Sequence, residues 1–276
     1  MNEPLIIRSL SSAELSELKD AREILENPAF TLRLANLIGT PIEKSIQLLP
    51  KGWQDSVGSA TQTALMKALQ LAVASLGRGK SGGSSNEFLH KVLAGTSVAI
   101  GGAFGLAALP VELPISTAII LRSIADIARS EGHDLESMET RLDCLSVFAL
   151  GAPLKHGHTA DSIYWGTRAA LSSSVSEAVT YLSRKGVVDG SAPALARLVN
   201  SIAARFGVLV SEEVAAKAVP IVGAATGSLI NVFFMAHFQD MARAHFTIRR
   251  LEGHYGTQAI QLCYEQLPGS ERDVLQ

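Results

Sequence analysis

The segment from Val92 to Leu121 contains a single charged residue, Glu112, which stands between Pro110 and Pro114. A helix that is apolar on all sides is stable only in a protein core or in a membrane. A carboxylate in such surroundings costs several kcal/mol unless it is paired. Glu112 is therefore either a structural anchor or a functional group.

The composition indicates an unusually apolar protein. At 276 residues the chain can bury a large core without disulfides or metals. Charged residues make up 18% and hydrophobic residues 47%, so much of the helical surface must face protein or lipid. With 24 basic and 26 acidic residues the net charge is −2, and no basic run stands out. This balance argues against a nucleic-acid partner.

Cysteine usage indicates a reducing compartment. Cys144 and Cys263 are too far apart for a metal knuckle and too few for a disulfide framework. Residues 1–10 lack the pattern of a secretory signal. We expect a cytoplasmic protein, and peripheral association with the inner membrane is compatible with this location. We expect no cofactor.

Hydrophobic periodicity predicts an all-α fold of one multi-helix domain, because alternating strand patterns are rare and short. Ser11 and Glu14 form a capping box that opens a helix to about Glu26. Further helices are expected at a short stretch ending near Gly39 and at 54–76, 134–151, 161–184, 193–207, 211–218, 220–251 and 258–266.

The sequence around Glu112 predicts a helix start. From Ser116 to Ser130, polar residues that include Arg122 and Asp126 share one arc, and apolar residues fill the other. We expect Glu112 to lie just before this helix, where free amides and the helix dipole favour a carboxylate. A buried cap or an ion pair with arginine is the structural interpretation. A catalytic or ligand-orienting carboxylate is the functional one.

Two Gly-rich apolar helices are expected at the centre of the fold. The run Val92–Val111 is long enough to cross a bilayer, but its glycines and prolines make it a poor membrane segment. Two glycine pairs have the spacing that permits close helix packing: Gly101 with Gly105, and Gly223 with Gly227. We expect a buried hairpin with the helix at 220–251. Insertion or peripheral embedding in a membrane is the alternative.

The helix at 220–251 carries further candidates. Asn231 is expected to be a buried amide that needs a partner. His245 is expected in the core. His237 and Asp240 are three residues apart and can meet as metal ligands or as an acid/base pair. No third ligand is in view, so metal binding is the weaker interpretation.

A denser cluster, His156, His158 and Asp161, lies at a predicted loop-to-helix junction. Asp161 is also a natural N-cap, so a metal site is again the weaker interpretation. The chain has no nucleophile elbow, no His-Glu-x-x-His and no paired CxxC.

Two regions resemble the signature of the bacterial EcsC family. They are Pro110–Pro114 with Ser116–Ala128, and Val219–Ala224 with Asn231 and Arg249–Gly256. The similarity defines a helical domain at 35–256 with a Gly/Ser-rich linker at 77–85. An N-terminal helical extension at 1–34 and a C-terminal helix and tail at 257–276 flank it.

The resemblance implies a bacterial helical protein of the cytoplasm or inner membrane. The family is named after a gene beside an ABC transporter gene, and the resemblance implies no catalytic residues. It marks Glu112, Arg122, Asn231 and Arg249 as positions within shared motifs.

The leading hypothesis is a non-enzymatic accessory protein that binds a lipid or the membrane surface and is linked to a membrane transporter. The candidate ligand-binding residues are Glu112, Arg122, Asp126, Asn231, His237, Asp240 and Arg249. One alternative is a hydrolase, with or without a metal, that uses Glu112 or the cluster His156, His158 and Asp161. The other is a scaffold that docks a membrane protein.

Overall fold

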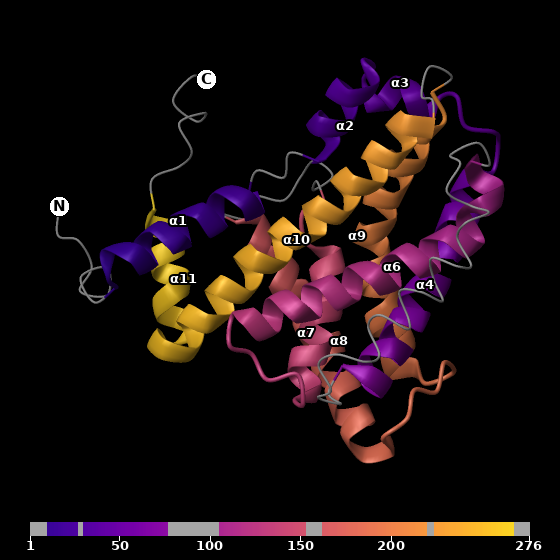
Figure 1. Ribbon diagram of the computed structural model, residues 1–276. Coiled ribbons are helices and arrows are strands. Elements are labelled where there is room, and N and C mark those ends of the chain that lie inside the picture. Colours follow the sequence, from indigo (N-terminus) through magenta and orange to yellow (C-terminus); the bar gives the residue numbers. More distant parts are fainter. Residues whose placement is uncertain (1–9, 27–29, 77–104, 153–161, 220–223, 268–276) are drawn as a thin grey trace.

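The computed structural model describes residues 10–26, 30–76, 105–152, 162–219 and 224–267 (Figure 1). These residues form one helical domain without a strand, which confirms the predicted all-α class. The helices are α1 (Ser12–Glu26), α2 (Phe30–Ile38), α3 (Ile42–Ile46), α4 (Trp53–Ser75), α6 (Gly105–Ser130), α7 (Met138–Ser146), the 3₁₀ turn η1 (Val147–Ala149), α8 (Ile163–Lys185), α9 (Pro193–Lys217), α10 (Ala224–Tyr255) and α11 (Thr257–Gln266).

The long helix α10 runs through the molecule and organises its neighbours (Figure 1). Helices α1 and α11 pack near its C-terminal end, and α2 packs near its N-terminal end. Helix α6 crosses α10, and a hydrogen bond of 2.8 Å from Gln239 to Ser123 joins the two. The main neighbour of α6 is α4. The predicted pairing of the two apolar helices, α6 with α10, is therefore one contact among several that α6 makes.

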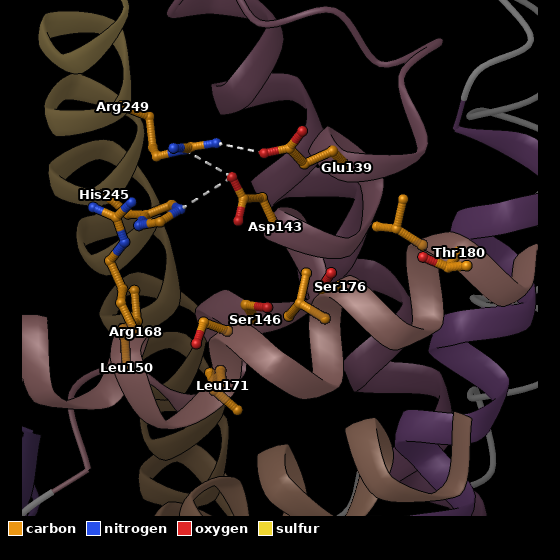
Figure 2. A pocket seen from close by; sticks show the side chains of 13 residues that line it. Glu139, Asp143, Ser146, Leu150, Arg168, Leu171, Ser176, Thr180, His245 and Arg249 are labelled. Atoms are coloured by element: carbon orange, nitrogen blue, oxygen red, sulfur yellow. Dashed lines mark hydrogen bonds and ion pairs between the residues drawn. The ribbon is translucent and has the colours of Figure 1, made fainter. Parts of the chain in front are cut away.

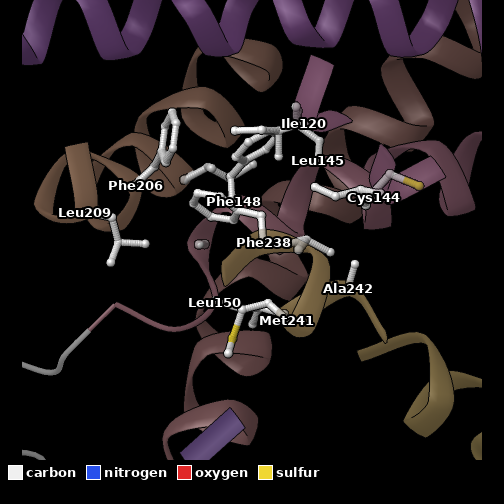
Figure 3. Close-up of a cluster of buried hydrophobic side chains, with 14 of the residues drawn as sticks. Ile120, Cys144, Leu145, Phe148, Leu150, Phe206, Leu209, Phe238, Met241 and Ala242 are labelled. Carbon is white, nitrogen blue, oxygen red and sulfur yellow. The ribbon is translucent and has the colours of Figure 1, made fainter. Parts of the chain in front are cut away.

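Aromatic side chains from three elements fill the centre of the core (Figure 3). The ring of Phe148 on η1 lies 4.9 Å from that of Phe206 on α9 and 5.2 Å from that of Phe238 on α10. All three side chains are fully buried. Aromatic rings bury large apolar areas and prefer such tilted contacts, so this cluster fixes the relative positions of α9, α10 and η1.

Polar contacts fix both ends of α1. The predicted capping box is confirmed, because the Ser11 amide donates to Glu14 (2.8 Å) and the Glu14 amide donates to Ser11 (3.2 Å). At the other end, Glu26 accepts hydrogen bonds from the Ile163 amide (2.8 Å) and the Tyr264 hydroxyl (2.7 Å). Glu26 thus joins α1 to the start of α8 and to α11.

Three predicted helix boundaries are wrong. The helix placed at 134–151 begins at Met138, because Asp134 instead accepts a hydrogen bond from the Glu136 amide (2.8 Å) in a turn. Ser162, not Asp161, caps α8, since its hydroxyl accepts from the Trp165 amide. The helices expected at 193–207 and 211–218 are one helix that continues through Gly207. The linker at 77–85 lies outside the described residues.

Gly151 ends the turn after η1 in the left-handed backbone region, with φ of +73°. A Cβ atom there would lie 2.6 Å from Cε1 of the buried His237 ring. We expect Gly151→Ala to lower the free energy of unfolding by about 2–4 kcal/mol, since the backbone is strained and a buried ring must move.

Chemical denaturation of Gly151→Ala beside Gly132→Ala measures this effect. Gly132 has a φ of +85°, but no atom lies within 4 Å of an added Cβ, so its variant reports the backbone strain alone. Equal losses in the two variants would show that the contact with His237 contributes nothing.

Candidate functional site

One end of the helix bundle exposes large apolar side chains. We call this surface the apolar end, and it consists of Leu32, Leu48, Val111, Leu229 and Val232, which are 47–63% exposed. They lie on α2, after α3, near the start of α6 and near the start of α10. Helices α2 and α3 pack on α9, whose C-terminal end contacts α6, so these segments meet at one end of the molecule (Figure 1).

Two described helices are long and apolar enough to cross a membrane, by length and composition alone. They are Ala108–Ser130 in α6 and Pro193–Lys217, which is α9. Less than half of each apolar window is buried, 44% in α6 and 39% in α9. Core helices of water-soluble proteins pass the same test, so this observation gains weight only beside the exposed residues of the apolar end.

Glu112 lies inside α6, not just before it, so the predicted helix-start position is wrong. The helix continues through Pro110 and Pro114. Its carboxylate pairs with the Lys217 ammonium of α9 at 2.8 Å, and the same ammonium pairs with Glu213 at 2.9 Å. Glu112 therefore makes an ion pair, as the structural interpretation predicted, but its partner is a lysine and not the expected arginine. This ion pair connects α6 and α9 beside the apolar end.

Burial and charge oppose each other in this ion pair. Burial favours the neutral amine of Lys217, but the charges of Glu213 and Glu112 outweigh it and raise the pKa of Lys217. Burial also raises the pKa of Glu213, and Lys217 only partly offsets it. The lysine is thus charged at neutral pH, and two carboxylates share it.

The other candidates on α6 and the first half of α10 are not gathered around Glu112. Arg122 is half-buried two to three turns further along α6. Asp126 is exposed and pairs with Arg129 at 2.9 Å in its own helix. Asn231 is exposed next to Val232, so its predicted burial is wrong. The sequence places Asn231 on an apolar helix, but that side of α10 is not covered by any described element.

His237 and Asp240 do not form the predicted pair among the described residues. His237 is 4% exposed and packs against the rings of Phe30 and Phe238. Burial lowers its pKa to about 4, with a smaller contribution from the charge of Arg33. Asp240 instead faces outward and pairs with Arg33 (3.6 Å) and with Arg243.

Arg249 lies in a dense group of charges on the C-terminal half of α10 (Figure 2). Its guanidinium pairs with Asp143 (2.9 Å), Glu139 (3.1 Å) and Glu252 (3.0 Å). Glu252, whose side chain is 3% exposed, also holds both terminal nitrogens of Arg168, at 2.7 and 3.1 Å. We call these residues the ionic cluster: Glu139, Asp143, Arg168, Arg249 and Glu252.

The electrostatics of the cluster keep Asp143 ionised. Burial disfavours its carboxylate, but the adjacent His245 and the guanidinium groups of Arg249 and Arg168 outweigh burial and lower its pKa to about 2. Burial lowers the pKa of His245 in spite of Asp143, so the ring is neutral at pH 7. His245 is 2% exposed, which confirms it as a core histidine.

The sequence analysis identified Arg249 but not the other four members of the cluster, Glu139, Asp143, Arg168 and Glu252. The cluster is assembled from α7, α8 and α10, which are far apart in the chain, so no local motif marks it. The sequence signal that was available is Asp143, a charged residue directly before the long, mostly apolar run that contains η1, at 144–152. A charge in such a place requires a partner.

The predicted metal ligands His156, His158 and Asp161 lie outside the described residues. Within the described part of the chain, no group of three His, Cys, Asp or Glu side chains is placed to hold a metal ion. The metal hypothesis therefore gains no support from the described residues.

Comparison with known families gives one match. The sequence profile of the EcsC protein family matches residues 12–251, which is most of the chain. No curated protein and no solved structure matches the chain.

Replacing Glu112 tests its structural role. We expect Glu112→Gln to lower the free energy of unfolding by about 1 kcal/mol, because Lys217 loses one of two carboxylates at a half-buried position. The control is Glu177→Gln, whose pair with Arg197 is well exposed and should contribute less than about 0.5 kcal/mol. Urea unfolding at pH 7 measures both variants, and equal losses would argue against the anchor role.

The lowered pKa of Asp143 predicts a pH dependence of stability. The folded pKa lies below the ordinary 3.8, so the stabilisation is present above pH 3.8 and is lost as pH falls towards about 2. The full loss is about 2 kcal/mol. Denaturant titrations from pH 5 to pH 3 should show a shallower decline for Asp143→Asn than for the wild type. Asp126→Asn, on the exposed face of α6, should keep the wild-type slope.

Proposed function

The chain belongs to the EcsC protein family, and from the position of its apolar end we propose that it is a non-enzymatic accessory protein that binds the lipid surface of a membrane. The surface supports this proposal because its five exposed Leu and Val side chains come from four separate segments that meet at one end of the bundle. Single exposed apolar residues are ordinary, whereas a group of them usually contacts a partner or a membrane.

The chain connectivity adds support at the same end. The uncharged sequence 92–104 directly precedes Gly105, the first residue of α6, the helix that carries Val111. The exposed residues Lys44 and Lys51 flank Leu48 in sequence. Lysines beside exposed leucines favour a surface that carries anionic headgroups.

We propose a peripheral position on the cytoplasmic side of the inner membrane. An interfacial protein embeds a few apolar side chains at the headgroup boundary and keeps its fold. This mode of binding suits α2, α6 and α10, because their other faces are buried in the core. A transporter in the same membrane is the proposed partner, on the basis of the family resemblance. Candidate residues at this end are Glu112, which anchors α6, and Asn231, which lies beside Val232.

Vesicle binding tests the proposal. The purified protein is mixed with vesicles of phosphatidylethanolamine and phosphatidylglycerol, and the bound fraction is measured by flotation. We expect the double variant Leu229→Ser, Val232→Ser to bind about tenfold more weakly, since part of the 1.5–3 kcal/mol for burying each side chain is lost.

Val187→Ser is the matched control. Val187 is 64% exposed but lies in the turn before α9, at the opposite end of that helix from Lys217, about 37 Å away for 25 residues. Its variant should bind like the wild type. A wild-type protein that does not float, or an equal loss in the control, would refute the proposal.

A further inference from the structure

A cavity of ≈ 380 Å³ lies between α7, α8 and α10, next to the ionic cluster (Figure 2). It has no part in the apolar end, because His245 in its lining and Leu229 are separated by about 24 Å along α10. Its volume falls in the range of small-molecule sites, about 300–1,000 Å³.

Helix α8 lines the cavity with two parallel rows of side chains. Residues four apart lie on the same face of a helix. The polar row is Arg168, Ser172, Ser176 and Thr180, and the apolar row is Leu171, Val175 and Val179. The cavity is therefore a slot about 18 Å long beside α8, charged at the Arg168 end and amphipathic along its length.

The charged end does not suit an anion. Arg249 contacts three carboxylates, and Arg168 is held by Glu252 and by the faces of Tyr164 and Trp165. In the ionic cluster three carboxylates face two guanidinium groups. A phosphate or carboxylate ligand would have to displace one of these carboxylates, which costs the pairing of a buried charge.

His245 presents a hydrogen-bond donor whose interaction with Asp143 is longer than an ordinary hydrogen bond. Arg168 donates to the Tyr164 oxygen (3.2 Å), so the Tyr164 proton is directed at Nδ1 of His245 (3.0 Å). The neutral ring then carries its proton on Nε2. This buried nitrogen has no described acceptor within 3.5 Å, and its nearest one, Oδ2 of Asp143, lies 3.9 Å away, too far for a full hydrogen bond.

A hydroxyl group matches this pair of atoms. Its oxygen accepts a hydrogen bond from Nε2 of His245, and its proton is donated to the ionised carboxylate of Asp143. An ammonium group satisfies only the carboxylate, and a carboxylate satisfies only the histidine. We propose that the cavity is a binding site for a linear aliphatic alcohol, with the hydroxyl between His245 and Asp143 and the chain against Leu171, Val175 and Val179.

The lining also argues against ring-shaped ligands. Apart from the imidazole of His245, no aromatic side chain lines the cavity among the described residues. Flat bases and sugars are commonly held by stacking on Trp, Tyr or Phe, whereas a flexible chain needs only Leu and Val. A free alkanol and the glycerol end of a monoacylglycerol share this chemistry.

A series of probes with one chain length tests the head group. The affinities of 1-octanol, octanoate, octylammonium and 1-octanoylglycerol are measured by calorimetry at pH 7. We expect 1-octanol and 1-octanoylglycerol to bind at least about tenfold more tightly than the two charged probes, because each of those leaves one buried polar group unsatisfied. Tighter binding of 1-octanoylglycerol than of 1-octanol identifies a lipid as the source.

Three variants test the location. Ser176→Phe fills the slot from an exposed position and should abolish binding, while Ser173→Phe, which is exposed on α8 outside the lining, should leave it unchanged. Asp143→Asn should weaken 1-octanol binding about tenfold. If Asp143→Asn fails to fold, the two serine variants still decide the question.

Octylammonium as the tightest probe would overturn the proposal, because charge alone would then select the ligand. No binding of any probe, or equal binding to Ser176→Phe and Ser173→Phe, would overturn it as well. Vesicle flotation of Ser176→Phe should match the wild type, so failure here is separate from failure of the membrane proposal.

Discussion

Several charged side chains in this apolar bundle make ion pairs or hydrogen bonds across helices, and these contacts constrain the positions of the helices. Glu26 connects α1 with α8 and α11. Glu252 connects α8 with α10, Asp143 connects α7 with α10, and Lys217 connects α6 with α9. Apolar packing is tolerant of small shifts, whereas an unpaired buried charge is not. These ion pairs and charged hydrogen bonds therefore help to select one arrangement from the many that a set of apolar helices permits.

The sequence predicted what depends on neighbours in the chain. The capping box of Ser11 and Glu14, the helical class and the burial of His245 all follow from local patterns, and the structure confirms them. The position of Glu112 does not follow from such patterns. Its flanking prolines predict a break, but α6 continues through them, and the fixed partner, Lys217, is 105 residues away. Local rules were overridden there by packing between distant segments.

The helix-start carboxylate expected at Glu112 occurs instead at Glu26. Its oxygens accept from the Ser162 hydroxyl and the Ile163 amide at the first turn of α8, where free amides are available. Nothing in the sequence near Glu26 indicates this contact, because the acceptor belongs to a different helix from the amides. The ionic cluster was missed for the same reason. Three helices supply its members, and only Arg249 lies in a recognisable motif.

The contacts of α6 bear on whether its apolar segment crosses a membrane or lies on one. Glu112 pairs with Lys217 of α9, and Ser123 accepts a hydrogen bond from Gln239 of α10, so polar groups at two levels of the helix are already satisfied by the bundle. Crossing a bilayer would separate these partners and leave a carboxylate in hydrocarbon, at a cost of several kcal/mol. Lying at the surface requires no such separation, since Val111, Leu229 and Val232 already face outward. The packing of α6 thus favours a membrane-surface position over a transmembrane one.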